Sequence, residues 1–501
     1  MAQYVVVNRR SGLFTDGAKI ASRATVQTTI DLLSSANLLA DHGPADPLAR
    51  RVSVIEADEG EVAAVREELP AEAIVEPVMR RDLHRLVPTE LQVAIPAAPP
   101  TPGTGSPYEV TIIGAGAALG DAEVLIYVRN TAGAIRLQRL RTDASGRIQT
   151  LIPHGFTVAY VEPVPYAGFW IMLAEAPADG STIDCSAIAK ANAQGGGWWH
   201  DAMNIDLSDA SRGSGIKVGV IDSGCGPHQN LGHVTLAGTF VDGLALPAAQ
   251  AADVITHGTH TSGIIGARPA QAGDYAGIAA GCSLFHARVF KGEAPDDAPT
   301  QADIVNAIDS LSRDHQCDLI NMSFGGSPSS KAEEDAIRDA GERGTLCICS
   351  AGNDAAAINF PAAYAECAAV SAIGKDGEAP AGTFAANNRP HDASKVAPEG
   401  LFLASFSCFG PTLACAAPGV GIVSSVPDRH GFTGAYMESD GTSMASPAAC
   451  GALAVILSKD PAYQLLSRDI SRTRRAAELL AQHCRDFGLP VDFQGRGLPS
   501  L

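Results

Sequence analysis

Three short strings of the sequence carry side chains that could work together as a nucleophile, a general base and an orienting acid. Asp222 directly follows an apolar run, His257 opens the string His-Gly-Thr-His, and Ser443 lies in the string Gly-Thr-Ser-Met-Ala-Ser-Pro. A serine hydroxyl becomes a nucleophile when a histidine accepts its proton, and an aspartate holds that histidine in the required tautomer. Together, the three residues predict acyl transfer through a covalent serine intermediate.

Each string has a simpler interpretation when it is taken alone. An aspartate after a strand is usually a turn or cap residue, and Gly-Thr-Ser before a helix can serve only as an N-cap. His257 and His260 have a spacing that metal ligands can have, but the glutamate of the helical zinc proteases and a nearby cysteine pair are missing. We therefore expect no metal site and no cofactor. The joint interpretation is preferred because chance would have to supply all three strings.

The elements that must position these residues alternate between apolar runs and helical patterns. Residues 216–221 are almost purely apolar, as expected of a parallel strand that is buried on both faces. Further strands are predicted at 319–322 and 345–349, and the helix between them opens at a capping box formed by Ser330 and Glu333. Repeated strand-helix-strand units predict an open parallel sheet covered by helices, with the active site at the carboxyl ends of the strands.

The N-terminal part of the chain has a different organisation. Apolar runs at 4–7, 52–55 and 73–78, with an acidic helical pattern between the last two, predict a small α+β domain. A proline-rich stretch follows and predicts a linker, after which short β-type runs separated by turn residues predict a small β-sandwich. The predicted parts are the α+β domain at 1–90, the linker at 91–107, the sandwich at 108–178 and the catalytic domain at 196–501.

Three glycines in the predicted sandwich superficially resemble a dinucleotide-binding fingerprint. Gly114, Gly116 and Gly120 follow an apolar strand pattern, but another β-type run begins at Glu123. A dinucleotide site needs a helix after the glycines, because the pyrophosphate binds at the N-terminus of that helix. We therefore expect a glycine-rich hairpin turn, and a nucleotide-dependent enzyme is an alternative that lacks its helix.

Residues 196–501 resemble the subtilisin-like serine proteases, the subtilase family or peptidase S8. The strings at 218–224, 257–263, 350–353, 416–419 and 441–447 match family motifs in the family's order. The resemblance implies a subtilisin-like three-layer α/β fold with a central parallel sheet, preceded here by a small α+β module and a small β-sandwich. It also implies that Asp222, His257 and Ser443 form a catalytic triad. The N-terminal module is similar, more weakly, to the inhibitory pro-domains of the family.

The same resemblance implies an oxyanion hole and a substrate cleft. The backbone N–H of Ser443 and the side-chain amide of Asn353 are the expected oxyanion donors. Asp354 beside them could favour a basic residue before the scissile bond, or it could be a solvated surface carboxylate. Two segments are expected to bind substrate, one by strand pairing and one as the facing wall of the S1 pocket. These residues are Ser323, Phe324 and Gly325 in the first segment, and Ala351 and Gly352 in the second.

These residues predict a serine endopeptidase that acts on protein or peptide substrates. A catalytically silent peptide-binding scaffold of the same fold is the alternative, and the complete set of expected catalytic residues argues against it. Residues 76–81 are extended enough to pair beside 323–325 as a substrate would. We therefore expect residues 1–90 to act as an intramolecular inhibitor whose tail lies across the active-site cleft.

Charge and cysteine content bear on partners and location. The formal net charge of −19 repels phosphate backbones and anionic membranes, so neither nucleic acid nor a membrane is an expected partner. The 11 cysteines are an odd number, and Cys347 and Cys349 would share one buried strand face, which favours free thiols in a reducing compartment. The apolar run after Met1 is too short for a secretory signal. These observations predict a cytoplasmic protein.

Overall fold

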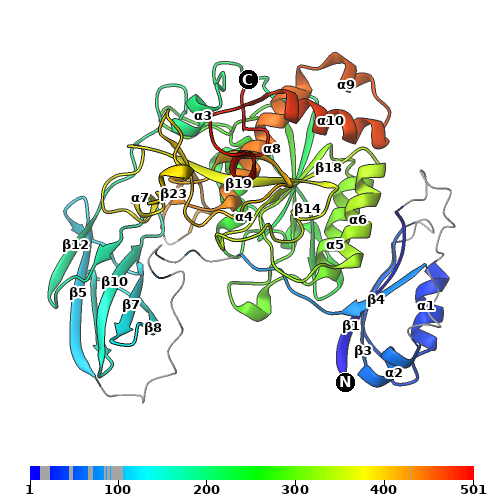
Figure 1. Cartoon of the computed structure of the whole chain (residues 1–501), viewed down its shortest axis with the longest axis horizontal. Coiled ribbons are helices and arrows are strands. Elements are labelled where there is room, and N and C mark those ends of the chain that lie inside the picture. Colours follow the sequence, from blue (N-terminus) through cyan, green and yellow to red (C-terminus); the bar gives the residue numbers. More distant parts are fainter. Residues whose placement is uncertain are drawn as a thin grey trace.

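We analysed a computed structural model, which describes residues 1–11, 23–44, 49–65, 72–83, 86, 88, 91, 105–429 and 431–501. Most of the predicted linker at 91–107 lies outside the described residues. Figure 1 shows a small N-terminal module and a β-sandwich on opposite sides of a large C-terminal domain.

The N-terminal module is a four-stranded antiparallel sheet with the strand order β2-β3-β1-β4. Its two faces are buried against different partners, because successive side chains of a strand point to opposite faces. Tyr4 and Val6 pack against the helices of the module, whereas Val5 and Val7 join a core cluster of the large domain. The elements are β1 (Ala2–Asn8), α1 (Arg23–Asp31), β2 (Asn37–His42), β3 (Val52–Ala57), α2 (Glu59–Val65) and β4 (Ala73–Pro77).

The β-sandwich consists of one sheet with the order β11-β10-β7-β8 and a second sheet with the order β12-β5-β6, to which β9 adds by pairing with β5. Its strands are β5 (Ser106–Gly114), β6 (Ala117–Ala118), β7 (Glu123–Asn130), β8 (Ile135–Arg141), β9 (Arg147–Ile152), β10 (Phe156–Val164), β11 (Ala174–Glu175) and β12 (Ser181–Cys185). Strands β5 and β6 pair antiparallel through Ile113 and Ala118. The glycines at 114 and 116 thus lie in the expected hairpin, and the next element is strand β7 instead of a helix.

The large domain is built on a nine-stranded sheet with the order β15-β14-β16-β13-β17-β18-β19-β20, in which β21 also pairs with β19. Seven strands run parallel, and only β15 and β20 pair antiparallel. The strands are β13 (Lys217–Asp222), β14 (Thr235–Val241), β15 (Leu244–Leu246), β16 (Ser283–Arg288), β17 (Leu319–Met322), β18 (Leu346–Ser350), β19 (Cys367–Lys375), β20 (Leu401–Leu403) and β21 (Leu413–Pro418).

Further elements surround this sheet. The principal helices are α3 (Trp198–Ala202), α4 (His257–Gly266), α5 (Gln301–Asp309), α6 (Lys331–Glu342), α7 (Phe384–Asn387), α8 (Thr442–Ser458), α9 (Pro461–Leu465), α10 (Ile470–Gln482) and α11 (Val491–Gln494). Two small hairpin-like sheets are formed by β22 (Ile422–Ser425) with β23 (Tyr436–Ser439) and by β24 (Cys484–Arg485) with β25 (Leu498–Pro499).

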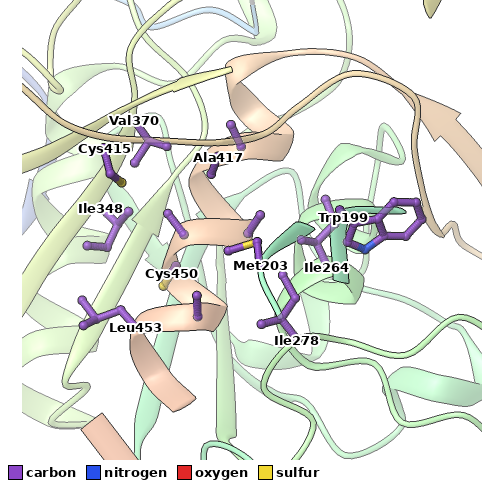
Figure 2. Packing of buried hydrophobic residues seen from close by; sticks show 14 of the residues in the cluster. Trp199, Met203, Ile264, Ile278, Ile348, Val370, Cys415, Ala417, Cys450 and Leu453 are labelled. Carbon is purple, nitrogen blue, oxygen red and sulfur yellow. The ribbon is translucent and has the colours of Figure 1, made fainter. Parts of the chain in front are cut away.

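The central sheet is covered on both faces, which confirms the predicted three-layer α/β fold. Helices α4 and α8 pack on one face in a core cluster that includes Ile348 (Figure 2). Helices α5 and α6 pack on the other face with Cys347 and Cys349. The alternation along β18 follows from strand geometry. The two cysteines share one buried face as the sequence predicts, and all 11 cysteines are free thiols in the structure.

The start of α6 differs in one respect from its prediction. Ser330 caps the helix by accepting a hydrogen bond from the backbone N–H of Glu333 at 3.1 Å, as expected. The Glu333 side chain does not return to the cap, because it is bound by Arg81 of the N-terminal segment at 2.7 to 3.2 Å. The capping box is therefore only half formed, and its glutamate connects two distant parts of the chain.

Candidate active site

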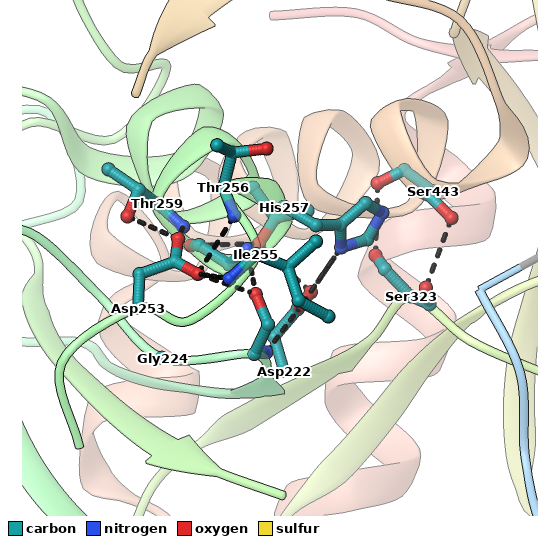
Figure 3. Close-up of polar contacts among 12 residues, drawn as sticks. Asp222, Gly224, Asp253, Ile255, Thr256, His257, Thr259, Ser323 and Ser443 are labelled. Atoms are coloured by element: carbon teal, nitrogen blue, oxygen red, sulfur yellow. Dashed lines mark hydrogen bonds and ion pairs between the residues drawn. The ribbon is translucent and has the colours of Figure 1, made fainter. Parts of the chain in front are cut away.

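Asp222 and His257 meet because a strand and a helix end at the same place. Asp222 is the last residue of β13 and is fully buried, and His257 is the first residue of α4. The two oxygens of the carboxylate lie 2.8 and 2.9 Å from Nδ1 of His257 (Figure 3). The backbone N–H of Ser223 and the hydroxyl of Thr261 also donate to this carboxylate. A carboxylate held in this way can fix both the tautomer and the orientation of the imidazole.

The electrostatics of this pair favour the charged form of both groups. Burial opposes the ionised carboxylate, but the charge of His257 and its hydrogen bond outweigh burial and lower the pKa of Asp222. Burial also opposes the imidazolium, and the charge and hydrogen bond of Asp222 outweigh it and raise the pKa of His257 above 6.5. The imidazolium form of His257 is therefore stabilised.

Asp253 is a supporting residue that the sequence interpretation missed. Its carboxylate accepts hydrogen bonds from the backbone N–H groups of Ile255, Thr256 and Thr259 and from the hydroxyl of Ser223. These bonds hold the turn before α4, where Thr256 adopts the unusual φ of +137°. An aspartate shortly before a predicted helix start was the available signal, because such residues are frequent caps.

Two glycines allow the strand end and the helix start to approach closely. A Cβ atom on Gly258 would lie 2.2 Å from the carbonyl oxygen of Gly224. A side chain on Gly258 would therefore push α4 away from the loop after β13. The Asp222–His257 distance depends on this contact.

Ser443 lies in the first turn of α8, on the other side of the His257 ring from Asp222 (Figure 3). Gly441, with a φ of +149°, makes the turn into the helix. The Ser443 hydroxyl donates to the carbonyl oxygen of Ser323 at 3.0 Å, and the Ser323 hydroxyl donates to the carbonyl oxygen of Ser443 at 2.9 Å. Within the described residues, no hydrogen bond joins Ser443 to His257. Catalytic hydrogen bonds are often loose without substrate and tighten when substrate binds.

The side chain of Asn353 is held beside the start of α8. Its Oδ1 accepts hydrogen bonds from the backbone N–H of Thr442 at 3.0 Å and from the hydroxyl of Thr442 at 2.8 Å. Because Thr442 fixes the acceptor end of the amide, the donor end, Nδ2, is also fixed in direction. The arrangement places an amide donor next to the first-turn N–H groups around Ser443.

The expected substrate-binding segments lie at the carboxyl ends of neighbouring strands. Gly325, after β17, exchanges two backbone hydrogen bonds with Asp82 of the N-terminal segment, at 3.0 and 3.1 Å. The side chain of Phe324 is buried against Phe290, so this segment offers its backbone for pairing. Ala351 and Gly352 follow β18 and are buried beside Asn353.

The N-terminal segment, which is the chain after β4 from residue 78 to residue 91, has a register that differs from the prediction. Residues 79–81 pair with residues 299–301 instead of with 323–325, since the N–H of Arg81 donates to the carbonyl oxygen of Pro299 at 3.0 Å. Pairing with the second edge begins at Asp82, one residue beyond the predicted stretch. The segment is thus bonded on both sides, as a central strand would be.

The histidines that could have formed a metal site have separate partners. Nε2 of His260 lies 3.1 Å from the carbonyl oxygen of Met437, whereas His257 contacts Asp222. In the part of the chain that the structure describes, no group of three or more potential ligands gathers around a metal position. Asp354 accepts a hydrogen bond from Asn359 at 2.7 Å in an exposed position.

Comparisons with known proteins agree with this geometry. The model of the subtilase family, peptidase S8, matches residues 213–478. The major intracellular serine protease of Bacillus subtilis is 30% identical over 289 residues, which are 56% of this chain and 78% of the relative. Subtilisin BL of Lederbergia lenta is 32% identical over 258 residues, which are 50% of this chain and 79% of the relative.

Two further matches are a relative of which the chain covers a small share and a solved structure. The minor extracellular protease Epr of Bacillus subtilis is 31% identical over 252 residues, and the chain covers 33% of that protein's length. A solved structure of a cold adapted subtilisin-like serine proteinase aligns with a TM-score of 0.42 at 23% identity, over 58% of this chain and 88% of that one.

The predicted cytoplasmic location is wrong in the light of these relatives. One relative is named as an extracellular protease and others are named as subtilisins, although another is named as intracellular. Free cysteines and a short N-terminal apolar run were weak signals, because buried thiols serve packing in any compartment. No helix in the described ranges is long and apolar enough to cross a membrane.

The family match covers more than half of the chain and includes Asp222, His257, Asn353 and Ser443. The resemblance stated from the sequence motifs is therefore confirmed. The chain belongs to the subtilase family, peptidase S8, and is a subtilisin-like serine endopeptidase.

Proposed function

We propose that Ser443 is the nucleophile of this peptidase and that Asp222, His257 and Asn353 complete its catalytic machinery. The observation that carries this proposal is the contact of Asp222 with Nδ1 of His257, with Ser443 on the far side of the ring. Hydrogen bonding of Nδ1 leaves Nε2 as the basic nitrogen. Turnover of a peptide substrate distinguishes this proposal from the peptide-binding scaffold, which would bind the peptide without cleaving it.

In the proposed mechanism, His257 removes the proton from Ser443 Oγ as this oxygen forms a bond to the scissile carbonyl carbon. The N–H of Ser443 and Nδ2 of Asn353 donate hydrogen bonds to the resulting oxyanion. The C–N bond then breaks, and the protonated His257 gives its proton to the leaving amine. Water, deprotonated by His257, attacks the acyl-enzyme and releases the second product and the free serine.

Peptide hydrolysis should lose activity at acid pH through protonation of His257. Because the pKa of His257 is raised above 6.5, the base is fully available only at pH values above that pKa. We expect kcat/KM to rise with pH with a midpoint above 6.5, and Asp222→Asn to move the midpoint lower because the carboxylate no longer stabilises the imidazolium. A pH profile of kcat/KM for both proteins measures this. An acid midpoint that is the same in both would contradict the role of Asp222.

Asn353→Ala should lower kcat by about 10²–10³ with little change in KM, because the lost hydrogen bond forms mainly to the oxyanion. Steady-state kinetics on one peptide substrate measure the two parameters separately. Asn387→Ala, on α7, is a control that removes an amide of the same type elsewhere. An increase in KM at unchanged kcat would indicate that Asn353 positions the substrate instead.

We also propose that the N-terminal module inhibits the peptidase by occupying its cleft. The segment that pairs with Gly325 through Asp82 uses the backbone bonds that a bound substrate would use. Arg81 forms a buried ion pair with Glu333 just before this point. The carboxylate of Glu76 accepts hydrogen bonds from Ser330, from the N–H of Lys331 and from the N–H of Ala332, at the positively polarised start of α6.

A second contact holds the body of the module against the back of helices α5 and α6. The Arg50 side chain is completely buried, and it forms ion pairs with Asp309 of α5 and with Asp335 of α6, the latter at 2.7 Å. Asp335 also accepts from the backbone N–H groups of Arg10 and Ser11. Because the module and its tail are covalently connected, these contacts give the tail a high effective concentration at the cleft.

A further inference from the structure

The β-sandwich borders the active-site cleft. A cleft of about 500 Å³ is lined by His257 and Ser443 of the large domain and by Glu123, Glu162 and Val164 of the sandwich. The three sandwich residues come from β7 and β10, which are neighbours in the sheet β11-β10-β7-β8. This sheet therefore forms one wall of the space in front of the catalytic residues.

The cleft-lining residues belong to the outer face of the sheet, where Glu123 and Glu162 lie beside an apolar cluster. On β7, Val124 and Ile126 point inward and pack in the core of the sandwich, whereas Leu125 and Tyr127 point outward and belong to a separate cluster. The outward pair is nevertheless buried, with exposed fractions of 0% for Leu125 and 2% for Tyr127. Side chains on the outer face of a sheet are buried only where another part of the molecule covers them.

Leu91 is one of the residues that cover this face. It is 6% exposed and packs in the cluster with Leu125, Tyr127, Ala159 and Tyr160. We refer to these four sandwich residues as the outer-face site. Leu91 of the N-terminal segment thus packs against the sandwich.

Other described residues that precede Leu91 in the sequence lie in the cleft. Asp82 pairs with Gly325, and Leu83 and Leu86 line the cleft. A chain that pairs antiparallel with Gly325 and continues along residues 323–325 runs toward Ser323. The carbonyl oxygen of Ser323 accepts the hydrogen bond of the Ser443 hydroxyl. The outer-face site therefore lies on the primed side, where a substrate places the residues that follow its scissile bond.

We infer that the outer-face site binds substrate on the primed side and takes an apolar side chain of the polypeptide at the place now occupied by Leu91. This inference rests on the proposed function of Ser443. A polypeptide that pairs with Gly325 in the same direction has the same path past the catalytic residues, and it meets the same apolar surface. Burial of one leucine side chain in such a site should raise kcat/KM about tenfold or more.

The test compares two internally quenched peptides with the same residues on both sides of the scissile bond. One carries leucine about six to eight residues after that bond, and the other carries aspartate there. This spacing follows from the register, because Leu91 is nine residues after Asp82, the partner of Gly325, and a chain in this register places the residue opposite Ser323 two positions after that partner. Both peptides compete for the full-length protein in one reaction. The ratio of their initial rates then gives the ratio of kcat/KM, and it does not depend on how much of the protein is inhibited.

We expect the leucine peptide to be preferred about tenfold or more. Leu125→Asn should remove most of this preference, because it places an amide in the outer-face site. The matched control is Leu137→Asn on the adjacent strand β8. Leu137 is 44% exposed in the structure, so Leu91 does not cover it as it covers the outer-face site. This control should keep the preference, and thermal unfolding of both variants checks that the sandwich is folded.

Equal rates for the two peptides with the wild-type protein would overturn the inference and leave the proposed function intact. An equal loss of preference in Leu125→Asn and Leu137→Asn would also overturn it, because the effect would not belong to the outer-face site. Absence of cleavage of both peptides, together with absence of fluorophosphonate labelling at Ser443, would instead overturn the proposed function on which the inference rests.

Discussion

Ser443→Ala is expected to abolish peptide hydrolysis, and Asp222→Asn is expected to lower kcat by about 10⁴. The first change removes the atom that attacks the substrate. The second keeps the size of the side chain at Nδ1 of His257 but replaces one carboxylate oxygen with an amide donor, which favours the wrong imidazole tautomer. Initial rates on a peptide substrate, measured with equal amounts of folded protein, give both effects.

The control for these variants is Ser471→Ala, an exposed serine in α10 that does not line the cleft. It should hydrolyse the same peptide at the wild-type rate. Substantial activity in Ser443→Ala would show that another group is the nucleophile. A loss of only a fewfold in Asp222→Asn would show that the contact with His257 does not control the tautomer.

Arg50→Ala should release the inhibitory tail and raise the rate at which a fluorophosphonate labels the full-length protein by about a hundredfold or more. Removal of one partner of a buried ion pair costs several kcal/mol, and here that cost falls on the contact between the module and helices α5 and α6. A less firmly docked module leaves the cleft for a larger fraction of the time. The measurement is the second-order rate constant of labelling for the wild type and the variant.

Arg51→Ala is the matched control, because the neighbouring arginine pairs with Asp41 inside the module and its partner is 34% exposed. A partly exposed pair of this kind contributes about 0–1 kcal/mol, so labelling should change by no more than a fewfold. Labelling of Arg50→Ala at the wild-type rate would contradict inhibition by the docked module. Equal acceleration in both variants would point to general destabilisation of the module instead.

The residues of the proposed catalytic site could be singled out in the sequence because their local strings constrain both chemistry and backbone. Asp222 ends a doubly buried strand, and Ser443 lies two residues after Gly441, whose φ of +149° few other residue types adopt. Asp253 could not be assigned in the same way. Its importance comes from several backbone N–H groups that converge on it only after the turn before α4 has formed.

Contacts between the separate parts of the chain were harder to predict than the parts themselves. Apolar alternation indicated the strands of the sandwich, but Leu125 and Tyr127 on its outer face carry no signal that identifies what covers them. The pairing partner of the N-terminal tail was correctly placed near Gly325, yet the register was displaced toward Asp82. An extended segment without a marked side-chain pattern can pair in several registers. Specific contacts, such as the ion pair of Arg81 with Glu333, determine which register forms.

The central claim is that Ser443 is the activated nucleophile of a subtilisin-like peptidase. Its most direct test is the site of fluorophosphonate modification, found by intact mass and peptide mapping. The assay includes wild type, Ser443→Ala and Arg50→Ala, so that occupancy of the cleft by the tail cannot conceal a reactive serine. We predict one adduct per chain, located on Ser443 and absent from Ser443→Ala. An adduct on a different residue, or no adduct even in Arg50→Ala, would contradict the claim.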